Sequence, residues 1–160
     1  MTLETTAAPL SRETDWEEFL RRLTEAVTAA DPGTAYDWEA RERMRFCAWV
    51  RHVYEDPGSS ALFARSELPV AAEARRREAA ALAERLDPGR AVTHRLQPGC
   101  DVWAAAAVAA AWEITTAALT AEERPAREHV VSDVWTVVRT LLLPAVDRFT
   151  PVFRRAPGSW

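Results

Sequence analysis

The stretch DVWAAAAVAAAWEITTAALT, residues 101–120, is apolar along nearly its whole length and carries one charged residue after Asp101, which is Glu113. A run of about 18 apolar residues is the length at which a membrane span is first considered. Alanine favours insertion only weakly, and a glutamate and two threonines interrupt the run. The pattern therefore predicts the central helix of a soluble bundle, buried on all sides, whose small side chains let neighbouring helices approach closely.

Glu113 is the unusual residue of this helix, because a buried carboxylate is costly unless it is paired or hydrogen-bonded. Three arrangements fit the sequence. Glu113 forms an ion pair with an arginine of a neighbouring helix, or it reaches solvent at the rim of the bundle. In the third arrangement it lines an internal cavity, where desolvation would raise its pKa and prepare it for proton transfer.

The segments on both sides of this stretch also have helical periodicity and are separated by Pro- and Gly-containing breaks. Residues 1–13 are predicted to be a tail, and Thr14 caps the first helix with Glu17 in capping-box spacing. Further helices are expected at about 36–55, 69–86, 102–119 and 121–143, with short ones near 59–68 and after Pro144. Thr34 and Thr120 are the expected caps of the second and last long helices.

No segment shows the alternation of a β-strand. The fold prediction is therefore all-α: a single-domain bundle of five main helices plus one or two short ones. The predicted bundle covers residues 14–156, and residues 157–160 form a C-terminal tail.

Composition narrows the class of protein. The chain has 160 residues, a net charge of -4 and a pI of about 5.5, which disfavours a nucleic-acid partner. The run Arg75–Arg77 lies among glutamates and is interpreted as a solvated helix face. All 20 basic residues are arginine, a bias typical of a G+C-rich genome such as that of an actinobacterium. Without a visible signal peptide or metal-type cysteine spacing, we expect a cytoplasmic protein with no membrane partner.

The helix at 36–55 has large aromatic residues on two sides. One predicted face is apolar and contains Tyr36, Ala40, Met44, Cys47 and Tyr54. The other face carries Trp38, Glu42, Arg45, Trp49 and His52 at spacings of three and four. Three interpretations of this second face remain open: arginine stems cover its tryptophans at the surface, it meets a partner, or it forms the wall of a ligand site.

The last long helix has a polar face that lacks the usual glutamates and arginines up to Arg139. It consists of His129, Ser132, Asp133, Thr136 and Thr140, whereas valines and leucines occupy the opposite side. Such a face is most often solvated, and it also suits a buried polar network. His129 and Asp133 are one turn apart, so the carboxylate could orient the imidazole for acid–base chemistry.

Seven tryptophans in 160 residues suggest more than ordinary packing. The leading hypothesis is a small soluble protein that binds a hydrophobic or aromatic small molecule between the helices at 36–55, 102–119 and 121–143. It would serve as a cofactor-independent acid/base enzyme or as an accessory protein of specialised metabolism. The predicted ligand-binding residues are Trp38, Arg45, Trp49, His52, Trp112 and Trp135. The predicted catalytic residues are Glu113, His129 and Asp133, and no cofactor or metal is expected.

The alternative hypothesis is a protein–protein interaction module, such as an antitoxin, an immunity protein or an assembly partner. Its contact surface would be the aromatic face that contains Trp38 and Trp49, since tryptophan is enriched at interface hot spots. A homodimer is compatible with both hypotheses. The two differ in where these tryptophans lie, because a ligand site needs them around a cavity and an interface needs them exposed.

Overall fold

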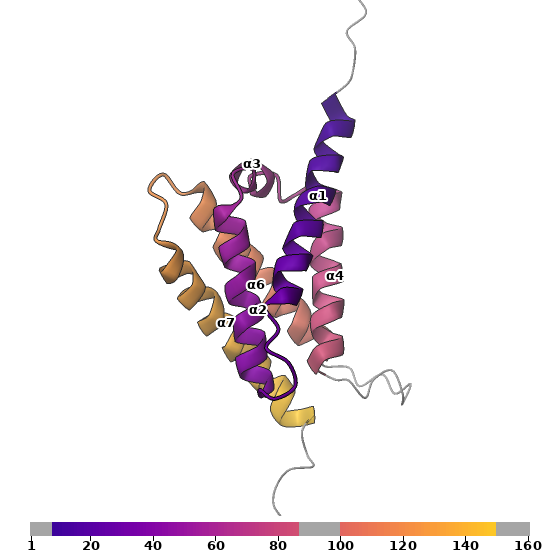
Figure 1. The fold of residues 1–160 in the computed structure, drawn as a ribbon, viewed down its shortest axis with the longest axis vertical. Coiled ribbons are helices and arrows are strands. Elements are labelled where there is room, and N and C mark those ends of the chain that lie inside the picture. Colours follow the sequence, from indigo (N-terminus) through magenta and orange to yellow (C-terminus); the bar gives the residue numbers. More distant parts are fainter. Residues whose placement is uncertain (1–7, 87–99, 150–160) are drawn as a thin grey trace, which may run out of the picture.

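The computed structural model describes residues 8–86 and 100–149, and this part of the chain contains six α-helices and no strand (Figure 1). The helices are α1 (Ala8–Ala29), α2 (Trp38–Glu55), α3 (Ser59–Phe63), α4 (Pro69–Leu86), α6 (Cys100–Thr120) and α7 (Arg127–Phe149). Five of them are long and α3 is a single short turn. The predicted all-α bundle of five main helices with a short additional one is confirmed.

The alanine-rich helix α6 is the central packing element. It contacts α4 and α7 extensively and α3 to a smaller extent, while α2 packs against α1 and α7. Figure 1 shows α6 behind α1 and α2, with α4 and α7 on opposite sides of the bundle. Its small residues Ala104, Ala107 and Ala111 are buried, which is consistent with close approach of the neighbouring helices.

The expectation that α6 is buried on all sides is wrong. Val102 is 69% exposed, and Ala105, Ala109 and Glu113 continue the exposed stripe at a spacing of three or four. Alanines occur on both faces, so along most of the helix the sequence offers little contrast between them. By length and mean hydropathy α6 could cross a membrane, a test that the core helix of a soluble protein also passes.

Several helix boundaries differ from the prediction. Helix α1 begins at Ala8 rather than Thr14, and its first turn tolerates Pro9 because N–H groups there have no intrahelical acceptor. Asp37, not Thr34, caps α2 by accepting the Ala40 N–H at 2.8 Å. Helix α7 begins at Arg127 and continues through Pro144 to Phe149, whereas Thr120 is the last residue of α6.

The two predicted faces of α2 are reversed in burial. The face that carries Glu42, Arg45 and Trp49 points into the core, while Tyr36 and Met44 of the predicted apolar face are 55% and 45% exposed. The reversal arises because the charged residues of the inner face are paired with one another and with α4. Pairing lowers the free-energy cost of burying these charges. The large aromatic side chains on the same face then determine that this face packs inward.

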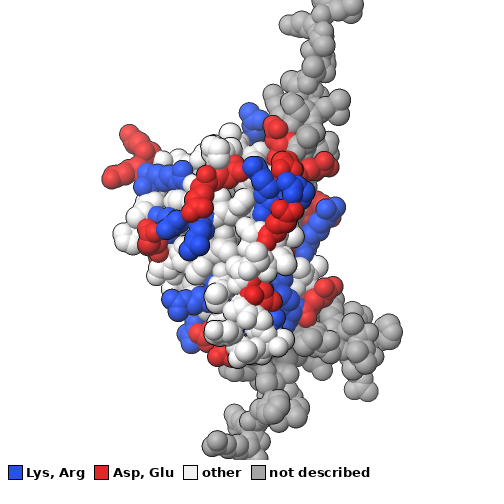
Figure 2. Space-filling view, in the orientation of Figure 1, with Lys and Arg blue, Asp and Glu red and all other residues white. Residues whose placement is uncertain are grey.

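The surface that lies toward the viewer in Figure 2 carries arginines and acidic residues interspersed with one another. Within the helices, several ion pairs join residues one turn apart, such as Arg21 with Glu18 and Glu25. Exposed pairs of this kind contribute little to stability, up to about 1 kcal/mol each. Among the described residues that are visible in Figure 2, no extended region of a single sign is seen.

Candidate functional site

Five aromatic side chains from four helices form the centre of the core. They are Trp16 and Phe19 of α1, Trp49 of α2, Phe63 of α3 and Trp112 of α6. The ring of Trp112 stacks on Phe63, with 4.8 Å between the ring centroids, and on Trp16 at 6.0 Å. Offset stacked rings of this kind contribute about 1 kcal/mol each beyond the burial of their area. This aromatic cluster therefore fixes the positions of Trp49 and Trp112.

Two of the three indole N–H groups in the aromatic cluster, those of Trp112 and Trp49, bind the same carboxylate, that of Glu78 on α4. Trp112 Nε1 donates to Glu78 Oε2 at 2.7 Å, and Trp49 Nε1 donates to Glu78 Oε1 at 3.1 Å. Burial raises the pKa of the Glu78 carboxyl, and the two indole hydrogen bonds act in the opposite direction. Glu78 is thus a carboxyl group placed by two rigid donors in a poorly hydrated environment.

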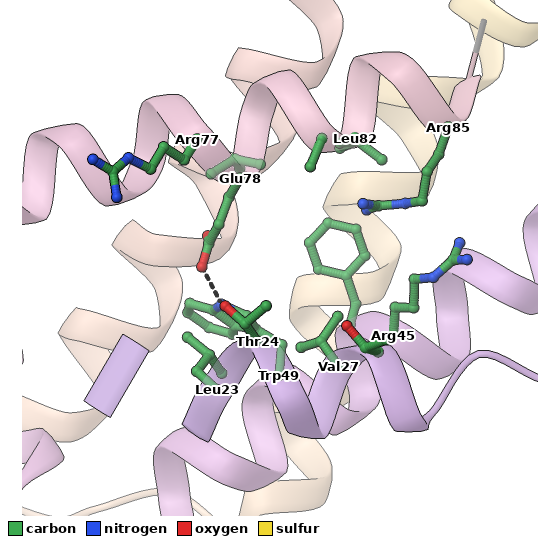
Figure 3. A pocket seen from close by; sticks show the side chains of 13 residues that line it. Leu23, Thr24, Val27, Arg45, Trp49, Arg77, Glu78, Leu82 and Arg85 are labelled. Carbon is green, nitrogen blue, oxygen red and sulfur yellow. Dashed lines mark hydrogen bonds between the residues drawn. The ribbon is translucent and has the colours of Figure 1, made fainter. Parts of the chain in front are cut away.

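A pocket of about 320 Å³ opens beside Glu78, between α1, α2 and α4. Apolar and aromatic side chains form most of its wall, and Val108 of α6 closes it on the inner side. In Figure 3, Glu78 extends from α4 across the pocket toward Trp49, whereas the Arg77 guanidinium points away from it. The other residues that line the pocket are Leu23, Thr24, Val27, Thr28, Arg45, Phe46, Ala81, Leu82 and Arg85.

A network of ion pairs lies at the other end of the pocket. Glu42, which is 2% exposed, accepts Arg85 Nε at 2.9 Å and Arg85 Nη2 at 3.0 Å, and it also pairs with Arg45. Arg45 in turn contacts Asp31, which accepts two bonds from Arg41 at 3.0 and 2.9 Å. Each charged side chain of this network is therefore paired with an oppositely charged side chain of the same protein.

Asp31 belongs to the turn between α1 and α2, so turn formation and the ion-pair network depend on each other. Its carboxylate accepts the N–H of Gly33 at 3.0 Å, and Gly33 has a φ of 87°, a conformation that glycine adopts without strain. The Arg41 guanidinium, followed by the Gly33 N–H, holds the pKa of Asp31 well below its usual range. The Pro- and Gly-containing break predicted between the first two helices therefore also supplies a charge to the network.

The predicted ligand-binding residues divide into three groups. Arg45 and Trp49 line the pocket, and Trp112 lies directly behind it, 1% exposed, as a donor to Glu78. Trp38 and Trp135 are half-buried and pack against the edge of the core. His52 lies against Phe19, with 5.6 Å between the ring centroids, and burial lowers the pKa of its imidazole.

The three residues predicted to be catalytic lie on the exposed surface. Glu113 faces solvent on α6, which corresponds to the rim position among its alternatives, and His129 and Asp133 are exposed on α7. None of them is among the residues that line the pocket. Within residues 8–86 and 100–149, no three His, Cys, Asp or Glu side chains are placed to hold a metal ion.

The residue pattern alone does not single out Glu78, because it lies next to Arg75–Arg77 in a run that has the composition of a solvated helix face. Its spacing carried a signal. Ala71, Ala74 and Leu82 are buried, and Glu78 follows Ala74 by four residues and precedes Leu82 by four. A glutamate at an apolar position of a helical repeat lies on the inward face.

Neither family models, nor curated protein sequences, nor solved structures give a match to this chain. We infer function from the pocket and from the charged groups that border it.

Proposed function

We propose that this protein binds a small hydrophobic or aromatic molecule in the pocket between α1, α2 and α4. The observation that carries the proposal is the combination of an apolar pocket of about 320 Å³ with a carboxyl group held in its wall by two tryptophans. Ligand pockets typically have volumes of about 300–1,000 Å³ and combine mostly apolar walls with a few fixed polar groups. This pocket has both properties.

The location of the aromatic residues favours ligand binding over the interaction module. That alternative needs an exposed aromatic face on α2, and Trp49 is only 5% exposed. The walls around Trp49 are preorganised because the aromatic cluster holds it from behind. A ligand would therefore meet a site that needs little ordering, which favours affinity.

A thermal-shift screen against hydrophobic and aromatic metabolites tests the proposal, because a ligand that binds the folded state raises the apparent melting temperature. Val27→Trp fills the pocket with a large side chain. Val131→Trp adds the same side chain at a partly buried position of α7 away from the pocket, and it serves as the matched control. We expect hits that persist in the control and disappear in Val27→Trp. A screen without hits, or hits that survive in Val27→Trp, would contradict the proposal.

A further inference from the structure

The charged groups that line the pocket are three arginines and one glutamate, and the arginines already have partners. Arg85 forms two hydrogen bonds to Glu42, and Arg45 pairs with both Glu42 and Asp31. Arg77 is exposed and its Nε donates to Glu73 at 2.8 Å. An anionic ligand would have to compete with these carboxylates for each guanidinium.

Glu78 differs from the arginines because its partners among the described residues are neutral. Its carboxylate accepts two indole N–H groups, and no ion pair within 4.0 Å joins it to an arginine in the part of the chain that the structure describes. The positive charges of Arg85 and Arg75 also lower the pKa of Glu78, but less than the indole hydrogen bonds do, and burial is the largest contribution. Arg75 is held elsewhere, over the ring of Trp112 and on the Ser66 carbonyl at 3.1 Å.

The Glu78 carboxylate can accept further hydrogen bonds from a donor group on a ligand. An ionised carboxylate accepts about four hydrogen bonds, and the two indoles occupy one position on each oxygen. A donor that also carries positive charge would offset the cost of keeping this carboxylate ionised in a poorly hydrated site. The face of Trp49 in the same wall also attracts cations.

We propose that the ligand is a hydrophobic amine, whose ammonium group pairs with Glu78 and whose apolar body lies along Leu82, Phe46 and Val27. This inference rests on the proposed function and specifies its ligand class. Arg85 lies seven residues beyond Glu78, about 10 Å along α4, at the far end of the same wall. A second ammonium at that end would meet a guanidinium, so the site selects a monoamine over a diamine.

Three probes with the same phenylbutyl body test the inference by calorimetry: phenylbutylamine, phenylbutanol and phenylbutyrate. Because the ammonium adds an ion pair to the hydrogen bond that either probe can donate to the Glu78 carboxylate, we expect the amine to bind at least about tenfold more tightly than the alcohol. Glu78→Gln should reduce this ratio to near one, mainly because the amine loses its ion pair and binds more weakly. Glu84→Gln, an exposed glutamate on the same helix, is the matched control and should keep the ratio.

Glu78→Asp provides a second variant that keeps the charge and withdraws it from the pocket by one methylene, so it should give an intermediate ratio. Circular dichroism establishes that each variant is folded before titration. An equal affinity for amine and alcohol, or an amine preference that survives in Glu78→Gln, would overturn the inference and leave the proposed function standing. Preference for the carboxylate would do the same and would assign the ligand contact to the arginines. If none of the three probes bound and the thermal-shift screen also gave no hits, both the proposed ligand-binding function and the inferred amine ligand would be overturned.

The pH dependence of binding gives an independent readout. The other charged groups that line the pocket are Arg45, Arg77 and Arg85, from α2 and α4, and they keep their charge over the whole accessible range. The lining residues of α1 and α6 do not titrate. Affinity for phenylbutylamine should therefore fall as the pH is lowered through the pKa of Glu78, with no matching change for phenylbutanol. A pH-independent amine affinity would count against the inference.

Discussion

Glu42 on α2 and Glu78 on α4 both place a carboxylate in the interior, but their surroundings are opposite. Glu42 pairs with the guanidinium groups of Arg45 and Arg85, and these arginines in turn connect to Asp31 and its turn. Glu78 receives two neutral indole donors and borders a pocket. The charge of Glu42 is balanced by two arginines, and this pairing stabilises the fold. The charge of Glu78 is not balanced by an ion pair among the described residues, so it remains available to a ligand.

Removing the charge of Glu42 should have the largest effect on stability. Glu42→Gln leaves the buried Arg45 with a single carboxylate partner, and we expect a loss of about 3 kcal/mol in the free energy of unfolding, measured by urea denaturation. Glu39→Gln is the matched control. It breaks an exposed pair with Arg139 and should cost about 1 kcal/mol or less. Equal losses in the two variants would remove the distinction between Glu42 and a surface glutamate.

Trp112→Phe tests how far Glu78 depends on its indole donors. The variant removes the shorter of the two hydrogen bonds and leaves space in the aromatic cluster, so we expect a loss of about 2 kcal/mol. The pKa of Glu78 should also rise further, since a bond that favours the ionised form is lost. Carbon-13 NMR of the labelled carboxyl measures this pKa, and a downward shift would be contrary to the expected role of Trp112.

Glu78→Gln should cost less than Glu42→Gln, about 1 kcal/mol or less. Its amide oxygen still accepts one indole, and the variant no longer has to bury a charge, which offsets the lost second bond. Urea denaturation at neutral pH measures the difference. A loss as large as that of Glu42→Gln would mean that Glu78 is a structural charge like Glu42.

The pH dependence of stability should separate the two regions further. Burial raises the pKa of Glu78 in the folded state. At a pH between the ordinary pKa and this raised pKa, Glu78 is therefore protonated in the folded protein and ionised in the unfolded chain. Stability should therefore fall as the pH rises from about 4 through that window, and Glu78→Gln should remove this decrease. Asp31 has a lowered pKa, so its contribution is present above the ordinary pKa and is lost as the pH falls toward the lowered value. If the stability of the wild type did not decrease over this pH range, or decreased equally in Glu78→Gln, the raised pKa assigned to Glu78 would be contradicted.

The smallest effects should come from the exposed residues that the sequence suggested as catalytic. We expect Glu113→Gln, His129→Gln and Asp133→Asn to change stability by less than about 0.5 kcal/mol, because each side chain faces solvent. Binding of hits from the ligand screen should also be unchanged, since none of the three lines the pocket. Loss of binding in any of these variants would place the ligand on α6 and α7 instead.

The sequence by itself determined the helices and most of their limits. Asp-Pro-Gly turns and Pro69 mark breaks that act over a few residues, and helical periodicity also depends on near neighbours. The number of helices, the short helix α3 and the extent of α4 follow from such local signals. The exceptions are the start of α1 at Ala8, the start of α7 at Arg127 and the passage of α7 through Pro144. A helix already formed on one side of a proline can continue beyond it when the surrounding packing favours this.

The tertiary structure alone decided which faces point inward and which charges meet. The outward face of α6 is poorly marked because alanines lie on both of its faces. The inward face of α2 carries charges whose burial depends on pairing with one another, with Asp31 and with Arg85 of α4. Glu78 receives donors from residues 29 and 34 positions away in the chain. A carboxylate's environment depends on such distant groups, and for that reason the site around Glu78 became visible only once the helices were packed together.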